Sequence, residues 1–525
     1  MKKLFLVNLA LIVFCLNTLA QKEGLAVIGK NDLKAYMTFF ASDEMEGRET
    51  GTWANDAAAM YLKTNLMRLA LNPLPNGDFI QKIPMQSTLI DSKGSYFKIT
   101  GTQGEEICST DSIVILMPPS KTMEAVDYVV FAGYGYSDTT TGYDDFKGVD
   151  LSGKIVLMMT RNPKIAYTER VDKIFEQEIE GPKLGQAFMR GPKAILYVYD
   201  PRNTFHDAYD SKLAEMIPSN SVTSRGKQSF SVPFQLLFIT QHTADQLLKT
   251  TGFNLSQMQE RIRTEGKPVS IEIPGIKATV RTKVDTSSFY ASNVIGVIEG
   301  SDPLLRNECI IYTAHFDHTG KNRSGEVNNG ADDNASGSMA LLEVAEAFMK
   351  LRKKPLRTIV FAWVNGEEKG LLGSQYYTTD PAMPLENTLV NINLDMVGRS
   401  KMASDTGKFA GYELDVTQPG EIMVYTAHES SELLQKMNES AHEVGIRVTD
   451  KGKEMGFGGS DHQTFMEEGI PALFFHSGIH ADLHSIRDDV EKIDFDKMER
   501  VSKMVFLLGY KVANQRKNLV VDHPQ

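Results

Sequence analysis

Apolar runs and helical repeats alternate along the C-terminal half of the chain. Short apolar runs, typical of buried strands, occur at 309–314, 358–364, 389–394 and 471–475. Apolar residues recur with a helical period at 335–350, 431–444 and 494–512. This alternation begins near residue 285 and predicts an α/β fold: a mostly parallel or mixed sheet with helices on both faces.

The N-terminal half has two different patterns. Residues 31–72 show helical spacing in two stretches separated by a polar, glycine-containing loop at 41–51. From about residue 85, short β-branched runs separated by turns predict a β-rich segment. The clearest of these runs are 112–116, 128–131, 154–159 and 194–199.

A β-rich block inside an α/β frame indicates an inserted domain. We therefore expect an N-terminal helical part at 21–84 and a main part at 285–515 to form one domain. Residues 85–284 would form the β-rich insert, and residues 516–525 a C-terminal tail.

Residues 1–20 have the pattern of a cleaved secretory signal peptide. Two lysines precede an apolar run from Leu4 to Leu16, and the small residue Ala20 stands before Gln21. The alternative, an uncleaved membrane anchor, is disfavoured because the apolar run is short for a membrane span. We expect a secreted or periplasmic protein.

Charge and cysteine content narrow the range of functions. The 525-residue chain has a formal net charge of −11, so it has no general attraction for nucleic acid or anionic lipid. We expect no nucleic-acid binding and no stable membrane association. Outside the first 20 residues only Cys108 and Cys309 remain, too few for a disulfide scaffold. Cys309 begins an apolar run and is expected in a buried strand.

Imidazole and carboxylate side chains follow the predicted strands. His315 follows the first run, Glu367 and Glu368 the second, and Asp395 the third, while Asp333 precedes the helix expected at 335–350. Ligands of open α/β sheets bind at the carboxyl ends of the strands. A loop at 479–489, after the last strand, can supply a fifth ligand. Such donors suit a pair of Zn²⁺ ions and indicate a metal-dependent hydrolase.

These segments resemble the motifs of peptidase family M28, the co-catalytic zinc aminopeptidases, with an inserted protease-associated (PA) domain. The matching motifs are 314–318, 330–337, 365–368, 393–399 and 484–489. The resemblance covers most of residues 31–72 and 285–510. For the insert it rests on residues 133–136, 143–150 and 151–157.

The resemblance implies a ligand set for two Zn²⁺ ions per chain. His315 and Asp395 would hold one zinc, and Glu368 and His484 the other. Asp333 would bridge the two ions.

The resemblance also implies roles for two further carboxylates. Asp317 would orient the ring of His315, and Glu367 would act as the general base. We do not expect His318 to be a ligand, and we expect Asp332 to be solvated or a turn acceptor.

A glycine-rich turn at 456–465 resembles the substrate-side loop of the family. The candidate substrate-binding residues are Arg399, Phe457, Ser460, Asp461 and His462. Some relatives have a tyrosine here that steadies the oxyanion, and because this chain has Phe457, His462 is a possible substitute. The alternative for the turn is an ordinary helix capped by Ser460 or Asp461. Arg399 either touches substrate or braces its strand end.

The predicted function is a secreted di-zinc metallopeptidase that releases N-terminal residues from peptide substrates. One alternative is a carboxypeptidase or dipeptidase, which would need basic residues near the pocket, and few are present. The others are a glutaminyl cyclase that uses one zinc and a non-catalytic, receptor-like scaffold; the full ligand set disfavours both. The PA-like insert could restrict access to the site or form a homodimer contact.

Overall fold

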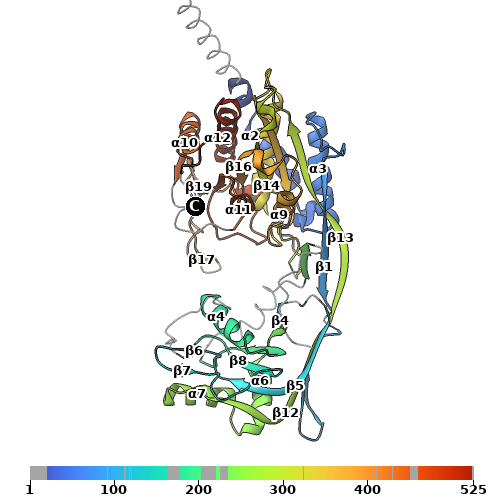
Figure 1. Ribbon diagram of the computed structural model, residues 1–525, viewed down its shortest axis with the longest axis vertical. Coiled ribbons are helices and arrows are strands. Elements are labelled where there is room, and N and C mark those ends of the chain that lie inside the picture. Colours follow the sequence, from blue (N-terminus) through green and yellow to red (C-terminus); the bar gives the residue numbers. More distant parts are fainter. Residues whose placement is uncertain are drawn as a thin grey trace, which may run out of the picture. The chain divides into compact units, whose positions relative to one another are not determined.

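The computed structural model forms two compact units, Met1–Pro84 with Phe289–Gln525, and Met85–Ser288 (Figure 1). The structure describes residues 21–91, 93–110, 114–117, 119, 121–163, 177–202, 220–224, 234–322, 324–409, 412–427, 430–449 and 459–522. The predicted signal peptide and Phe457 lie outside these residues. Within them, no helix is both long and apolar enough to cross a membrane.

The first unit is built on a mixed sheet. Its strands, in spatial order, are β1 (Ile80–Ile90), β13 (Val284–Ile298), β15 (Thr358–Val364), β14 (Cys309–His315), β16 (Thr388–Leu394), β21 (Ala472–His476), β19 (Glu421–Ala427) and β20 (Arg447–Thr449). The central strands β15, β14, β16 and β21 are parallel, whereas β13 and β19 flank them in antiparallel pairing. The parallel centre brings four strand ends to one edge of the sheet.

Helices cover both faces of this sheet. One core contains Ile310 and Tyr312 of β14 together with side chains of α2 (Lys30–Phe40), α3 (Trp53–Arg68), α8 (Gly337–Met349), α10 (Ser431–Val444) and α12 (Phe495–Asn514). The alternate residues Cys309 and Ile311 point to the other face, as strand geometry requires, and pack with α9 (Leu372–Thr379) and α11 (His462–Glu467). The predicted α/β class is confirmed, and Cys309 is a buried strand residue.

The second unit has its own sheet and its own core. The spatial order is β3 (Glu106–Thr110), β2 (Tyr96–Thr100), β12 (Ser270–Thr282), β5 (Met123–Ala132), β8 (Ile155–Met159), β9 (Ala194–Val198), β11 (Gln235–Phe238) and β4 (Val114–Met117). Within this unit, β10 (Asn220–Ser224) pairs with residues 85–89 of β1. Two short strands, β6 (Ser137–Asp138) and β7 (Tyr143–Asp144), form a separate pair.

The second unit also contains helices, which we did not predict. These are α4 (Gln177–Phe188), α6 (Gln241–Leu248) and α7 (Leu255–Glu265). Leu247 of α6 and Ile262 of α7 are buried against Leu157 and Leu196 of the sheet. The eight-stranded sheet agrees with a β-rich insert, while its assignment as a PA domain stays a prediction.

Candidate metal centre and active site

Five predicted ligands lie at the carboxyl edge of the parallel strands. His315 is the last residue of β14, Asp395 follows β16, and Glu368 follows β15. His484 lies in the loop after β21. Asp333 lies in η4 (Ala331–Ser336), a single irregular turn that leads into α8. Neighbouring parallel strands end at the same edge of the sheet, and this brings the five side chains together.

The carboxylate of Asp333 stands between two groups of donors. Its Oδ1 is 3.4 Å from His315 Nε2, which is 3.2 Å from Asp395 Oδ1. Its Oδ2 is 3.0 Å from His484 Nε2, which is 3.2 Å from Glu368 Oε2. Each oxygen of Asp333 therefore faces a different imidazole and a different second carboxylate.

The first group fits a zinc ion. His315 Nε2 and Asp395 Oδ1 are both buried and 3.2 Å apart, yet neither makes a hydrogen bond. Zinc bonds of 2.0–2.2 Å in tetrahedral geometry separate ligand atoms by about 3.3 Å. Buried donor atoms at this spacing, with unused lone pairs, suit a cation better than they suit each other. Zinc also prefers imidazole and carboxylate donors of this kind.

His318 belongs to the second group, which the sequence did not lead us to expect. Its Nδ1 is 2.8 Å from Glu368 Oε1 and 3.6 Å from Asp333 Oδ2, and the ring is fully buried. Together these three residues could hold a metal ion. The available signal was its spacing, three residues after His315. The structure thus gives His318 two roles to choose from, as a hydrogen-bond partner of Glu368 or as a further ligand.

Asp317 connects the first imidazole to Glu367. The Nδ1 of His315 lies 3.2 Å from the main-chain oxygen of Asp317 and 3.8 Å from its carboxylate. The carboxylate accepts hydrogen bonds from Thr50 Oγ1 at 3.0 Å and from the main-chain N–H of Glu367 at 3.2 Å. The ring of His315 therefore meets the carbonyl of Asp317 first, while the carboxylate fixes the segment of Glu367.

The two adjacent glutamates have opposite electrostatic surroundings. Burial raises the pKa of Glu367, and the carboxylates of Glu368 and Asp395 add to this rise. Burial acts in the same direction on Glu368, but His484 and His318 hold its pKa well below the usual range. Cations beside Glu367 would lower its pKa, because an opposite charge favours the ionised carboxyl.

The residues of the glycine-rich turn are buried close to the first group. Ser460 Oγ accepts a hydrogen bond from Asn393 Nδ2 at 2.8 Å. Burial raises the pKa of Asp461 to about 7 and lowers that of His462 to about 4, so the imidazole is neutral. The ring of His462 stacks on Phe474 at 4.4 Å between centroids.

The predicted alternative for this turn, an N-capped helix, is correct only in part. Helix α11 does begin at His462, with Asp461 at its N-cap position. No side-chain hydrogen bond caps the helix, and neither carboxylate oxygen of Asp461 has a hydrogen-bond partner among the described residues. The carboxyl of Asp461 is thus not used as a cap.

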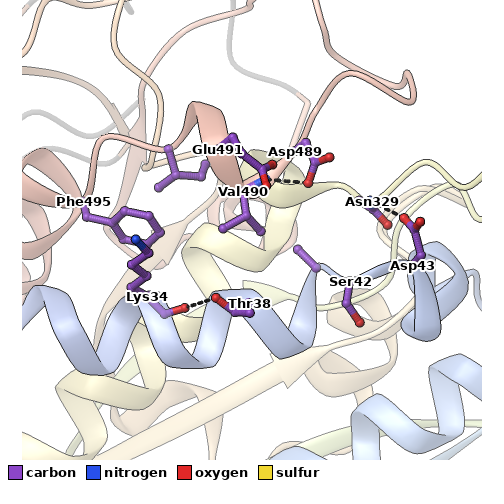
Figure 2. Close-up of a pocket in the computed structure, with 11 residues that line it drawn as sticks. Lys34, Thr38, Ser42, Asp43, Asn329, Asp489, Val490, Glu491 and Phe495 are labelled. Atoms are coloured by element: carbon purple, nitrogen blue, oxygen red, sulfur yellow. Dashed lines mark hydrogen bonds between the residues drawn. The ribbon is translucent and has the colours of Figure 1, made fainter.

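A cavity of about 450 Å³ lies on the first unit but does not contain the metal centre (Figure 2). Its wall includes Asp43, Asn329, Asp489, Glu491 and Phe495, and none of the five predicted ligands. Asn329 Nδ2 donates to Asp43 Oδ1 at 2.8 Å across this wall. Concavity alone would have placed the site at the wrong position, whereas side-chain chemistry identifies the strand edge.

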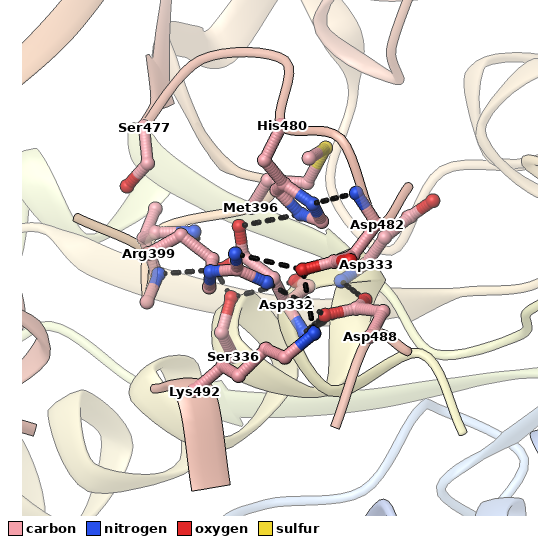
Figure 3. Close-up of polar contacts among 12 residues, drawn as sticks. Asp332, Asp333, Ser336, Met396, Arg399, Ser477, His480, Asp482, Asp488 and Lys492 are labelled. Atoms are coloured by element: carbon pink, nitrogen blue, oxygen red, sulfur yellow. Dashed lines mark hydrogen bonds and ion pairs between the residues drawn. The ribbon is translucent and has the colours of Figure 1, made fainter. Parts of the chain in front are cut away.

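Arg399 and Asp332 belong to a buried polar network beside the metal centre (Figure 3). Arg399 Nη2 is 3.0 Å from Asp482 Oδ2, which favours bracing over substrate contact. We expected Asp332 to be solvated or a turn acceptor, and the first option is wrong. Its Oδ1 accepts the N–H of Gly398 at 2.7 Å, and its Oδ2 lies 3.4 Å from His480 Nε2.

Curated relatives share part of the sequence. Residues 293–508 match the sequence model of peptidase family M28. A probable leucine aminopeptidase of Trichophyton verrucosum is 30% identical over 209 residues, 38% of this chain and 53% of that protein. Another, of Arthroderma otae, is 26% identical over 330 residues, 61% of this chain and 80% of that protein. The chain thus spans about half the length of the first relative.

Solved structures share the fold over nearly the whole chain. An aminopeptidase from Aneurinibacillus sp. strain AM-1 has a TM-score of 0.57 at 20% identity, covering 96% of this chain and 98% of that one. A zinc aminopeptidase from Bacillus subtilis has a TM-score of 0.52 at 18% identity, covering 95% and 99%. Fold and donor groups together define an α/β protein of the zinc-peptidase class. Through residues 293–508, the chain belongs to peptidase family M28.

Proposed function

We propose that this chain is an exported di-zinc aminopeptidase. The observation that carries the proposal is the carboxylate of Asp333, whose oxygens lie 3.4 Å from His315 Nε2 and 3.0 Å from His484 Nε2. A carboxylate shared by two donor groups is what a pair of metal ions requires. The names of the Trichophyton and Arthroderma relatives, both probable leucine aminopeptidases, support the choice of reaction.

The ligands divide between the two groups. His315 and Asp395 would hold one zinc, Glu368 and His484 the other, and Asp333 would bridge them. Bound zinc supplies Lewis acidity, which makes water more acidic and polarises the scissile carbonyl. The surrounding carboxylates would also attract the α-ammonium group of a peptide, which favours release of the N-terminal residue.

Glu367 is the proposed general base. Its main-chain N–H is held by Asp317 at 3.2 Å, and its carboxyl lies within electrostatic reach of His315 and Asp395. The carboxylate would take a proton from the attacking water and pass it to the leaving amine. Proton transfer of this kind contributes roughly 10²–10⁴-fold to the rate.

The alternative reactions have weaker support. A carboxypeptidase or dipeptidase needs a cation for the substrate carboxylate, and Arg399, our candidate, is buried against Asp482. A glutaminyl cyclase with one zinc would leave the second donor group without a purpose. A receptor-like scaffold would need neither group.

Metal content and hydrolysis test the proposal together. We expect about two zinc ions per mature chain by elemental analysis, and chelator-sensitive hydrolysis of aminoacyl amides with a free α-amine. The same amides carrying an acetylated amine should resist cleavage. One zinc without hydrolysis would favour the cyclase, and no zinc would favour the scaffold.

Glu367→Gln tests the general base. The variant should retain both zinc ions and lose roughly 10²-fold or more in kcat. The matched control is Glu386→Gln, which changes an exposed glutamate of the same unit and should leave kcat unchanged. Undiminished hydrolysis by Glu367→Gln with both metals bound would remove Glu367 from the mechanism.

Export is tested separately. N-terminal sequencing of protein recovered outside the cytoplasm should begin at Gln21. A chain that begins at Met1 would contradict the proposed cleavage.

A further inference from the structure

One side chain binds three consecutive backbone amides in the segment of Asp333. The carboxylate of Asp488 accepts the N–H of Asp332 at 3.0 and 3.1 Å and that of Asp333 at 3.0 Å (Figure 3). The main-chain oxygen of Asp488 accepts the N–H of Ala331 at 3.2 Å. Because Asp488 is fully buried, water does not compete for these bonds.

A buried cation binds the carbonyls just before those amides. The guanidinium of Arg48 donates to the main-chain oxygens of Asn329 at 2.9 Å and Gly330 at 3.0 Å. It also donates to Phe40 O at 2.7 Å and to Phe316 O at 3.0 Å, beside the first imidazole ligand. Arg48 has no exposed surface, although it lies in a loop that looks polar in the sequence.

The two charges match the polarity of the backbone groups that they meet. Arg48, a donor, binds carbonyl oxygens on one side of Ala331, and Asp488, an acceptor, binds amides on the other. Burial lowers the pKa of Arg48 to about 10, so it remains a cation at neutral pH. Charge-assisted hydrogen bonds of this kind are roughly twice as strong as neutral ones.

The segment between these charges has little room to move. Gly330 has a φ of 56°, and a Cβ atom there would lie 2.3 Å from the main-chain oxygen of Asp333. A side chain at this position would therefore be strained and would also clash. Asp488 adds a further link, because it lies four residues after His484 in the same loop.

We propose that Arg48 and Asp488 are positioning residues of the metal centre, which hold the segment of Asp333 so that its two carboxylate oxygens stay divided between the donor groups. The inference rests on the proposed function, in which Asp333 bridges two zinc ions. Neither residue belongs to the donor groups, so the effect on metal binding acts through the backbone.

Two conservative variants test the inference on the full chain. Asp488→Asn keeps the size of the side chain but turns an amide NH₂ toward backbone N–H groups. Arg48→Lys keeps the charge but replaces a planar fork of donors with a single nitrogen. Loss of a partner that orients metal ligands costs roughly 10–100-fold in metal affinity. We expect zinc dissociation constants to rise by that factor in competition with a chromophoric chelator.

A spectroscopic readout separates positioning from general loss of stability. With Co²⁺ in place of zinc, the visible absorption bands report the geometry of the ligands. We expect these bands to change in both variants. Thermal unfolding of the metal-free proteins would show how far each substitution destabilises the fold itself.

Matched controls exist for both substitutions. Arg357 is another fully buried arginine, and it donates to main-chain oxygens of the C-terminal segment, including Val512 at 3.4 Å. Arg357→Lys should lower stability without changing zinc affinity or the cobalt bands. Asp489→Asn changes the neighbour of Asp488, whose Oδ1 accepts the N–H of Val490 at 2.7 Å, and should also leave both readouts unchanged.

The outcomes distinguish the inference from the proposed function. Weaker zinc binding and altered cobalt bands in Asp488→Asn, with both controls normal, would support the inference. Wild-type affinity and bands in both variants would overturn it and leave the proposed function intact. A wild-type chain that binds no zinc would overturn both. If Arg48→Lys does not fold, Asp488→Asn decides alone.

Discussion

Replacing Glu343 with glutamine should make the protein more stable at alkaline pH. Glu343 lies in α8, the helix that follows the segment of Asp333, and is 2% exposed. Its Oε2 accepts the main-chain N–H of Gly29 at 3.3 Å. Burial raises the pKa of Glu343 from 4.5 to about 8, and the nearby carboxylates of Asp32 and Glu346 add to the rise.

The sign follows from proton binding. Between pH 4.5 and about 8 the folded chain keeps a proton on Glu343 that the unfolded chain has lost. The free energy of unfolding therefore falls as pH rises, by at most about 1.4 kcal/mol per pH unit. Across this span of about 3.5 pH units the ceiling is about 5 kcal/mol. Relaxation around the site reduces this ceiling, and we expect roughly 2 kcal/mol, a size common for single substitutions.

The assay is thermal unfolding of wild type and Glu343→Gln at pH 5, 6.5, 8 and 9. Glutamine can still accept the N–H of Gly29 but cannot ionise. We expect equal Tm values at pH 5 and a variant that is roughly 3–6 °C more stable at pH 9. Glu346→Gln, which breaks an ion pair with Arg68 at 2.8 Å, should cost less than about 1 kcal/mol without this pH trend. A constant offset between wild type and Glu343→Gln at every pH would refute the reasoning.

Three further substitutions separate the donor groups from their supports and from the core. His484→Ala should reduce zinc content from about two ions to about one by elemental analysis; an unchanged content would show that His318 is a sufficient replacement ligand. Thr50→Val removes the hydroxyl donor to Asp317 at 3.0 Å, and a loss of about 1 kcal/mol should lower kcat roughly fivefold at unchanged zinc content. An unchanged kcat would argue against a role for that bond. Tyr312→Phe removes a 2.8 Å hydrogen bond to a carbonyl of α12 and should cost about 1 kcal/mol in unfolding experiments, with normal hydrolysis. Impaired hydrolysis would show that core and site are coupled.

The parallel centre of the sheet was predictable because both of its faces are covered. All seven residues of Thr358–Val364 are buried, so the strand appears in the sequence as an unbroken apolar run with the predicted limits. Helix Ser431–Val444 was predicted at its observed limits because it buries one face only. Helices Gln241–Leu248 and Leu255–Glu265 were missed, since each is short and has few apolar positions within a block of strands.

The ligands were predictable for a chemical reason. Zinc selects imidazole and carboxylate donors, and such residues stand out where they follow apolar strands, as His315 and Asp395 do. His318 was set aside because a histidine in a loop is usually polar surface, and the sequence does not show that this loop is buried. Asp332 was misjudged for the same reason.

Arg48 and Asp488 show why the supports of a metal centre leave a weaker trace in sequence than the ligands do. Both bind main-chain N–H and C=O groups, and nearly every residue carries these whatever its side chain. No motif at 329–333 announces that an arginine almost three hundred positions earlier will meet its carbonyls. A loop can be buried at a sheet edge only if its backbone polar groups find partners there. Buried charged side chains that meet this requirement therefore mark the supports in structure, while the sequence shows only a polar loop.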